Sequence, residues 1–157
     1  MNFKYSTDQV DALVEKMRPL VSRIESSFSN GISLYGAGFL GTWACKYLEA
    51  LGAKINHFID RDQQKIGSKL NNVSIISPES EELSSALTIL IASRHVVREV
   101  EKDMSHLDCI KMSFEGYFVC RNYERLAAVR DNFFSDDKSI ETFNALLIAM
   151  ITASLKP

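Results

Sequence analysis

A short apolar run followed by three spaced glycines constrains this chain more than any other feature of its sequence. Residues 32–35 predict a buried β-strand, which leads directly into the pattern Gly-x-Gly-x-x-Gly formed by Gly36, Ala37, Gly38, Phe39, Leu40 and Gly41. In such a pattern the first glycine makes a tight turn, the second lets backbone approach a pyrophosphate, and the third lets helix and strand pack closely. The N–H groups at the start of the following helix favour an anion. The stretch therefore predicts a strand, a glycine turn and a helix of the dinucleotide-binding type.

Apolar runs alternate with helical patterns after this turn. A helix is expected over residues 39–51, with Gly52 ending it in a left-handed conformation. Further strands are expected at residues 53–59, 73–76, 87–92 and 109–114, with 73–76 at the edge of the sheet. Helical segments are expected at 63–67, from a Ser77 cap, and over 94–106 after a Ser93 cap. The alternation predicts an α/β fold, namely a Rossmann-like doubly wound parallel sheet of about five strands in the order 3-2-1-4-5.

Helical segments flank this predicted sheet on both sides. Residues 1–29 predict an N-terminal helical segment with a capping box from Ser6 to Gln9, and Pro19 within it predicts a kink or the junction of two helices. Residues 30–116 are the expected Rossmann-like nucleotide-binding domain. Residues 117–157 form a C-terminal helical extension, whose last helix begins at a Ser135 cap and is apolar around most of its circumference. We expect that helix to pack in a homodimer or against another domain.

The composition of the chain excludes several classes of function. The chain has 157 residues, which suits one domain, and a net charge of −2 from 18 basic and 20 acidic residues. Without a basic stripe, nucleic acid is not an expected partner. Three cysteines without metal-ligand spacing favour neither a disulfide framework nor a zinc site, and fit a reducing, cytoplasmic location. The N-terminus lacks the apolar core of a signal peptide and no run is long enough for a membrane span, so we expect no membrane association.

Two charged residues follow the second predicted strand. Asp60 lies 24 positions after Gly36, where an acid in a dinucleotide site accepts hydrogen bonds from the ribose hydroxyls. The alternative is that Asp60 is a solvated turn residue. Arg61 could contact a phosphate or could be an ordinary surface charge.

A second group of candidates follows the predicted strand 87–92. Ser93, Arg94 and His95 lie at the carboxyl end of a strand expected beside the first one, across the point where the strand order reverses and where ligands bind in such sheets. Arg94 could hold a phosphate and His95 could titrate or donate a hydrogen bond. The alternative is a helix cap followed by two surface residues. The sequence offers no nucleophile, general base and orienting group at positions that would bring them together, and no cluster of His and carboxylate residues suggests a metal site. No catalytic or metal-binding residue is therefore assigned.

Several segments together resemble a known family. The sequences at 34–38, 58–62, 65–67, 75–79 and 89–93 are similar to the Rossmann-type domain that precedes FkbM-type methyltransferases, and 134–143 resembles the helical connector to the methyltransferase domain. The resemblance implies an accessory, nucleotide-binding-like domain in sugar or natural-product methylation. The chain ends where the catalytic half would begin, so we expect no methyltransferase activity from it alone, and a methyltransferase domain is a candidate partner for the C-terminal helices.

The glycine turn also separates candidate cofactors. Leu34 stands two residues before Gly36, where common methyl-donor sites place an acid, so S-adenosylmethionine is disfavoured and NAD(P) or a nucleotide-sugar is preferred. The leading hypothesis is a non-catalytic nucleotide or nucleotide-sugar binding module. One alternative is a small NAD-dependent oxidoreductase with His95 as its proton donor. Another is a structural dimerisation domain whose glycine turn binds no ligand.

Overall fold

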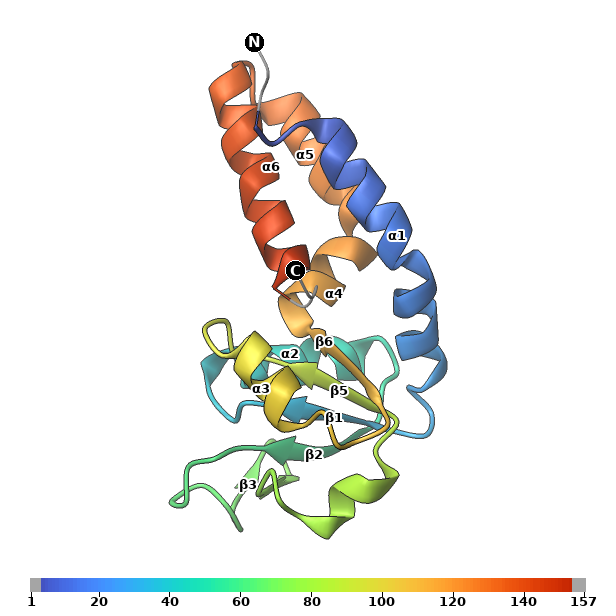
Figure 1. Ribbon diagram of the computed structural model, residues 1–157, viewed down its shortest axis with the longest axis vertical. Coiled ribbons are helices and arrows are strands. Elements are labelled where there is room, and N and C mark those ends of the chain that lie inside the picture. The colour runs from blue at the N-terminus through green and yellow to red at the C-terminus, as the bar shows by residue number, and fades with distance from the viewer. Residues whose placement is uncertain (1–3, 154–157) are drawn as a thin grey trace.

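Six strands form a mostly parallel sheet in the computed structural model, which describes residues 4–153 (Figure 1). The strands lie in the order β3-β4-β2-β1-β5-β6. Their bounds are β1 Ile32–Tyr35, β2 Ile55–Ile59, β3 Lys69–Leu70, β4 Val73–Ile76, β5 Thr88–Ile91 and β6 Ile110–Ser113. The helices are α1 Thr7–Ser26, α2 Phe39–Ala50, α3 Val97–Asp103, α4 Phe114–Arg121, α5 Tyr123–Phe133 and α6 Asp137–Thr152, with a 3₁₀ helix η1 at Glu81–Ser85.

The structure confirms the α/β class. The five predicted strands correspond to β1, β2, β4, β5 and β6 and lie side by side in parallel in the predicted order. The full sheet differs because β3, which was not predicted, pairs antiparallel with β4 and takes the edge position expected for residues 73–76. Asn71 and Asn72, with φ of 48° and 63°, form the two-residue turn of this hairpin. Asparagine tolerates such positive φ values, which a tight hairpin turn requires at both positions.

Helices cover both faces of the sheet, so its central strands are buried (Figure 1). Successive strand residues point to opposite faces. Leu34 and Phe58 share a cluster with α2, whereas Tyr35 and Ile59 share a cluster with α3 and η1. All four residues of β1 are buried, as expected for a parallel strand covered on both sides.

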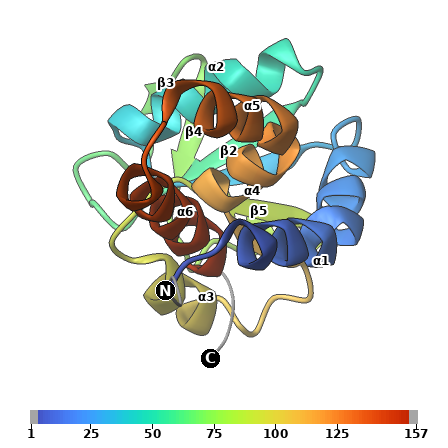
Figure 2. The ribbon, with the colours of Figure 1, turned by 90° about the horizontal axis from the view of Figure 1, so that it is seen from above.

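The helices from the two ends of the chain pack together above the sheet (Figures 1 and 2). The helix α1 contacts α4 and α6, and α5 contacts α4 and α6. An aromatic cluster joins this layer to α2, since Trp43 stacks on Tyr47 and both meet Phe114 and Phe118 of α4 edge-on. On α6, Leu147 and Ile151 are buried, whereas Leu146 is half-exposed. Packing within the chain therefore covers part of the apolar surface for which a partner was expected.

The predicted start of α1 is confirmed, and of the two alternatives predicted at Pro19, a kink or a junction of two helices, the junction is wrong. Ser6 and Gln9 form the capping box. The helix continues through Pro19 to Ser26, so the alternative of two helices meeting there is wrong. Buried residues on one face before and after the proline, Met17 and Ile24 among them, hold both parts against the same core.

Other element boundaries differ from the prediction, in two cases because a neighbouring residue takes the capping role. Residues 63–67 form a hydrogen-bonded turn and no helix. Ser77 accepts a hydrogen bond from the N–H of Glu79, but the helical turn that follows is η1, capped by Ser80. Asp136, not Ser135, caps α6. The helix α3 begins at Val97 rather than at residue 94, so Ser93 is not a helix cap. Residues 1–3 and 154–157 of the predicted terminal segments lie outside the described residues.

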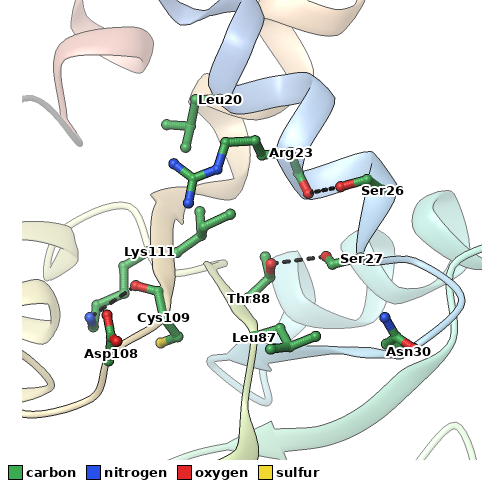
Figure 3. A pocket seen from close by; sticks show the side chains of 11 residues that line it. Leu20, Arg23, Ser26, Ser27, Asn30, Leu87, Thr88, Asp108, Cys109 and Lys111 are labelled. Carbon is green, nitrogen blue, oxygen red and sulfur yellow. Dashed lines mark hydrogen bonds between the residues drawn. The ribbon is translucent and has the colours of Figure 1, made fainter.

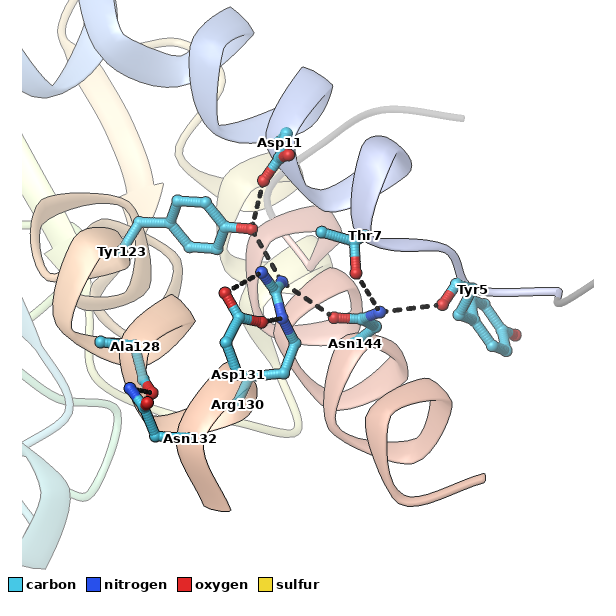
Figure 4. Close-up of polar contacts among 9 residues, drawn as sticks. All are labelled: Tyr5, Thr7, Asp11, Tyr123, Ala128, Arg130, Asp131, Asn132 and Asn144. Carbon is cyan, nitrogen blue, oxygen red and sulfur yellow. Dashed lines mark hydrogen bonds and ion pairs between the residues drawn. The ribbon is translucent and has the colours of Figure 1, made fainter. Parts of the chain in front are cut away.

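A buried arginine links three helices of the upper layer (Figure 4). Arg130 of α5 is 3% exposed and donates to the hydroxyl of Tyr123 at 3.0 Å and to Oδ1 of Asn144 on α6 at 3.2 Å. It also forms an ion pair with Asp131. Tyr123 in turn donates to Asp11 of α1. The guanidinium therefore satisfies buried oxygen atoms that α1, α5 and α6 enclose.

Replacing Arg130 with Met should destabilise the fold. The variant leaves the buried Oδ1 of Asn144 without a donor, and a buried unsatisfied acceptor costs about 1–3 kcal/mol, so we expect a loss of about 2–4 kcal/mol including the other lost contacts. Urea unfolding measures this. Arg125→Met is the matched control, because Arg125 lies exposed on the same helix; it should change stability by less than about 0.5 kcal/mol. Equal effects of the two variants would contradict the role assigned to the buried network.

Candidate functional site

Each glycine of the turn after β1 meets a different steric requirement. Gly36 has a φ of +103°, and a Cβ there would lie 2.8 Å from the carbonyl oxygen of Ala92. A Cβ on Gly41 would lie 1.9 Å from the carbonyl oxygen of Gly36, so only glycine lets α2 lie this close to the turn. A Cβ on Gly38 would have no atom within 4 Å. Gly38 is therefore the position at which the backbone faces open space, as its expected role near a ligand requires.

The helix α2 begins without a side-chain cap. Gly38 is its N-cap and provides no side-chain hydrogen bond, and its first turn contains no acidic residue. By contrast, Ser6 and Asp136 cap α1 and α6 through their side chains. The first N–H groups of an α-helix have no acceptor within the helix, and the helix dipole places partial positive charge there. The start of α2 can therefore receive an anion.

The start of α2 opens into a cavity of about 600 Å³ at the carboxyl end of the parallel sheet. The strand β1 lies between β2 and β5, and the strand order reverses between β1 and β5, which is where ligands bind in open α/β sheets. We call this the glycine-turn cavity. It is lined by Gly36, Ala37, Gly38, Phe39, Leu40, Asp60, Lys65, Ala92, Ser93, Arg94 and His95.

The structure thus brings most of the predicted site residues around one cavity. Of those predicted residues, Gly41 and Arg61 do not line it. Lys65 and Ala92 line it and were not predicted. Lys65 is brought back toward Asp60 by the turn in which the N–H groups of Lys65 and Ile66 bond the carbonyl of Asp62, and its Nζ lies 3.5 Å from Oδ2 of Asp60. The spacing of Asp62 and Lys65, three positions apart in a tight turn, is the signal that could have identified Lys65.

Asp60 holds the glycine turn in place. Its Oδ2 accepts a hydrogen bond of 2.9 Å from the N–H of Ala37, and its Oδ1 accepts one of 2.9 Å from the N–H of Asp62. Partial burial acts to raise the pKa of Asp60, but these two N–H groups and the Lys65 ammonium outweigh it, so the pKa lies below its ordinary value. Asp60 lines the cavity as an ionised group, and both of its oxygens already accept a backbone hydrogen bond.

Arg61 does not line this cavity. Its guanidinium donates to Glu99, at 2.9 Å, and to Asp103, and both acids belong to α3. Hydrogen bonding to Glu99 raises its pKa. Arg61 therefore connects the end of β2 to α3 instead of contacting the phosphate position for which it was considered.

The segment after β5 supplies one side of the cavity. Arg94 bonds Glu115 of α4 through two of its nitrogen atoms, with Nε 2.9 Å from Oε1. Glu115 is 11% exposed at its side chain, whereas Arg94 is 65% exposed, so the arginine neutralises a nearly buried carboxylate. His95 is exposed beside it. In this segment the charge of Arg94 is already paired with Glu115, and within residues 4–153 no hydrogen bond or ion pair orients the ring of His95.

The two aromatic residues near the start of α2 behave differently. Phe39 lines the cavity yet is 90% exposed, so it does not fill the space before the helix. Trp43 packs against Tyr47 and α4 and does not line the cavity. Trp43 therefore has a packing role, and neither aromatic ring fills the space in front of Gly38.

A second cavity of about 580 Å³ lies at the opposite end of the sheet, between the end of α1 and the amino ends of β5 and β6 (Figure 3). The basic side chains that line it are Arg23 and Lys111. The ammonium of Lys111 already donates to the carbonyls of Leu107 and Cys109. The buried hydroxyls of Ser27 and Thr88 bond each other. Its lysine and its two buried hydroxyls are thus paired with the protein, and within the described part of the chain no uncapped start of a long helix lines it, so size alone does not make this cavity the better candidate.

Other site types find less support in the part of the chain that the structure describes. Within residues 4–153 no group of three or more His, Cys, Asp or Glu side chains is placed to hold a metal ion. No helix in that range has the length and apolar character needed to cross a bilayer. A scan against protein-family models and searches of curated proteins and of solved structures gave no match to this chain. The geometry of the glycine-turn cavity therefore carries the functional argument.

Replacing Asp60 with Asn should weaken the fold in a pH-dependent way. At neutral pH we expect a loss of about 1–2 kcal/mol, because hydrogen bonds to a charged carboxylate are replaced by bonds to an amide. The pKa of Asp60 is lowered in the folded state, so its stabilisation is fully present above the unfolded pKa of about 3.9 and is lost as the pH falls through the folded pKa.

Urea unfolding of wild type and Asp60→Asn between neutral pH and about pH 3 measures this difference. Asp108→Asn is the control, since Asp108 is exposed, and it should leave stability nearly unchanged. A difference between wild type and Asp60→Asn that does not shrink at low pH would show that the carboxylate charge does not stabilise the turn.

Proposed function

We propose that this chain is a Rossmann-like module that binds the diphosphate of a nucleotide or nucleotide-sugar in the glycine-turn cavity. The observation that carries the proposal is Gly38, where backbone at the start of an uncapped helix faces open space inside a cavity at the carboxyl end of the sheet. Backbone N–H groups and a helix dipole are what a diphosphate requires. The Lys65 ammonium, 3.5 Å from Oδ2 of Asp60, offsets the negative charge of that carboxylate at the cavity wall.

Binding without catalysis accounts for these residues better than hydride transfer does. An NAD-dependent oxidoreductase needs a positioned proton donor beside the nicotinamide. His95 is the candidate in the cavity, but it is exposed, and within the described residues nothing is placed to orient its ring. A purely structural role for the turn explains Gly36 and Gly41, whose Cβ atoms would clash, but gives no reason for glycine at position 38. We therefore favour a binding module, in keeping with the accessory domain that the sequence resembles.

Nucleotides should stabilise the protein through this turn. A ligand at 100 times its dissociation constant adds about 2.7 kcal/mol, which for a chain of this size raises the melting temperature by about 5–10 °C. We expect such a shift with NAD, NADP or a UDP-sugar and none with S-adenosylmethionine. Gly38→Val should abolish the shift while lowering the ligand-free melting temperature only slightly, because its side chain enters open space in an extended backbone although valine is a poorer N-cap than glycine.

Ala50→Val is the matched control, because it adds the same kind of bulk to the exposed far end of α2. It should retain the full shift. If the melting-temperature shift persists in Gly38→Val, the ligand binds elsewhere. If none of the nucleotides raises the melting temperature of wild type, the proposal is wrong.

Lys65 should contribute electrostatically to the same binding. Its side chain is about two-fifths exposed and lies beside Asp60 at the cavity wall. Lys65→Ala should weaken nucleotide affinity about fivefold to tenfold at low salt, and the loss should shrink as salt screens the charge. Titration calorimetry at two salt concentrations measures both effects. Lys69→Ala removes an exposed charge from β3, outside the cavity, and the two variants should differ clearly in affinity; equal losses would mean that only net charge matters.

A further inference from the structure

Phe39 is the most exposed large apolar side chain in the part of the chain that the structure describes. It is 90% exposed, compared with 79% for Phe133 and 43% for Trp43. Unlike those two residues, it lines the glycine-turn cavity, as the first residue of α2 directly after Gly38. An aromatic ring held in water beside helix N–H groups has a free face, and that face is where a flat ligand group can pack.

The other lining residues leave the recognition of a base to this ring. Asp60 already accepts hydrogen bonds from Ala37 and Asp62 with its two oxygens, and Arg94 is paired with Glu115. Apart from Phe39, no Phe, Tyr or Trp side chain lines the cavity within residues 4–153. In a nucleoside diphosphate only the ribose separates the base from the phosphates, so a base can reach the residue next to the amides that hold the diphosphate.

We propose that Phe39 is the platform on which the base of the bound nucleotide stacks. This inference rests on the proposed function and specifies its ligand class as nucleoside diphosphates and their derivatives, in preference to inorganic phosphate or pyrophosphate. Stacking tolerates different bases because every base has a π-face, so purine and pyrimidine nucleotides are both accepted.

Titration calorimetry with pyrophosphate, ADP and UDP tests this on the whole chain. Wild type binds ADP and UDP more tightly than pyrophosphate. Phe39→Ala weakens ADP and UDP about tenfold and leaves pyrophosphate unchanged, because only the stacking partner is removed. Phe39→Trp restores nucleotide affinity, since Trp also offers a flat ring. Phe133→Ala, which removes an exposed phenylalanine from α5, changes none of the three affinities.

Different outcomes would contradict the stacking role of Phe39 and the proposed binding of a diphosphate. If Phe39→Ala leaves nucleotide binding intact, or weakens pyrophosphate as much as ADP, the stacking role is overturned while diphosphate binding stands. If none of the three compounds binds to wild type, both are overturned. Because Phe39 contacts little of the protein, the melting temperature of each variant should match that of wild type and shows that the fold is retained.

Discussion

The contact between Gly41 and the carbonyl of Gly36 determines where α2 can lie. A Cβ at residue 41 would come within 1.9 Å of that oxygen, so any other residue would push the helix away from the turn. Gly36 is restricted in the same way by the carbonyl of Ala92 at the end of β5. Two missing side chains therefore let the turn, α2 and the segment after β5 meet. The cavity and the direction of its N–H groups follow from this close approach.

The Asp60 carboxylate holds the glycine turn by a hydrogen bond, in addition to the steric restraint at Gly36 and Gly41. The N–H of Gly36 bonds the carbonyl of Ile59 at 2.8 Å, and one residue later the N–H of Ala37 bonds the Asp60 carboxylate. The turn is thus attached at successive residues to the end of β2. A loop held in this way loses little conformational entropy when a ligand binds, which favours affinity. The acid expected to recognise ribose therefore also preorganises the turn that would hold the diphosphate.

Sequence patterns predicted the sheet well because each of its central strands has a strong local signal. Apolar runs such as residues 32–35 and 87–92 and the glycine spacing sufficed for the strand order and for most cavity residues. The prediction failed where the deciding group is distant in sequence or where two caps compete. Arg61 was a candidate phosphate ligand only because its acidic partners on α3 could not be foreseen, and Asp136 displaced the adjacent Ser135 as a cap. The hairpin at Asn71 was missed because a strand of two residues has almost no periodicity.

The two large cavities show why volume is a weak guide to function. They are nearly equal in size, at about 600 and 580 Å³, and both contain basic side chains. At the amino end of the sheet, the lysine and the hydroxyls already bond protein groups. At the carboxyl end, the helix start lacks a cap and Gly38 leaves space beside it. Parallel strands joined by helices place helix N-termini at that end of the sheet, so unsatisfied donors gather where the strand order reverses. Unpaired donors and topology, more than empty space, are therefore the features that support the proposal of a binding site in the glycine-turn cavity.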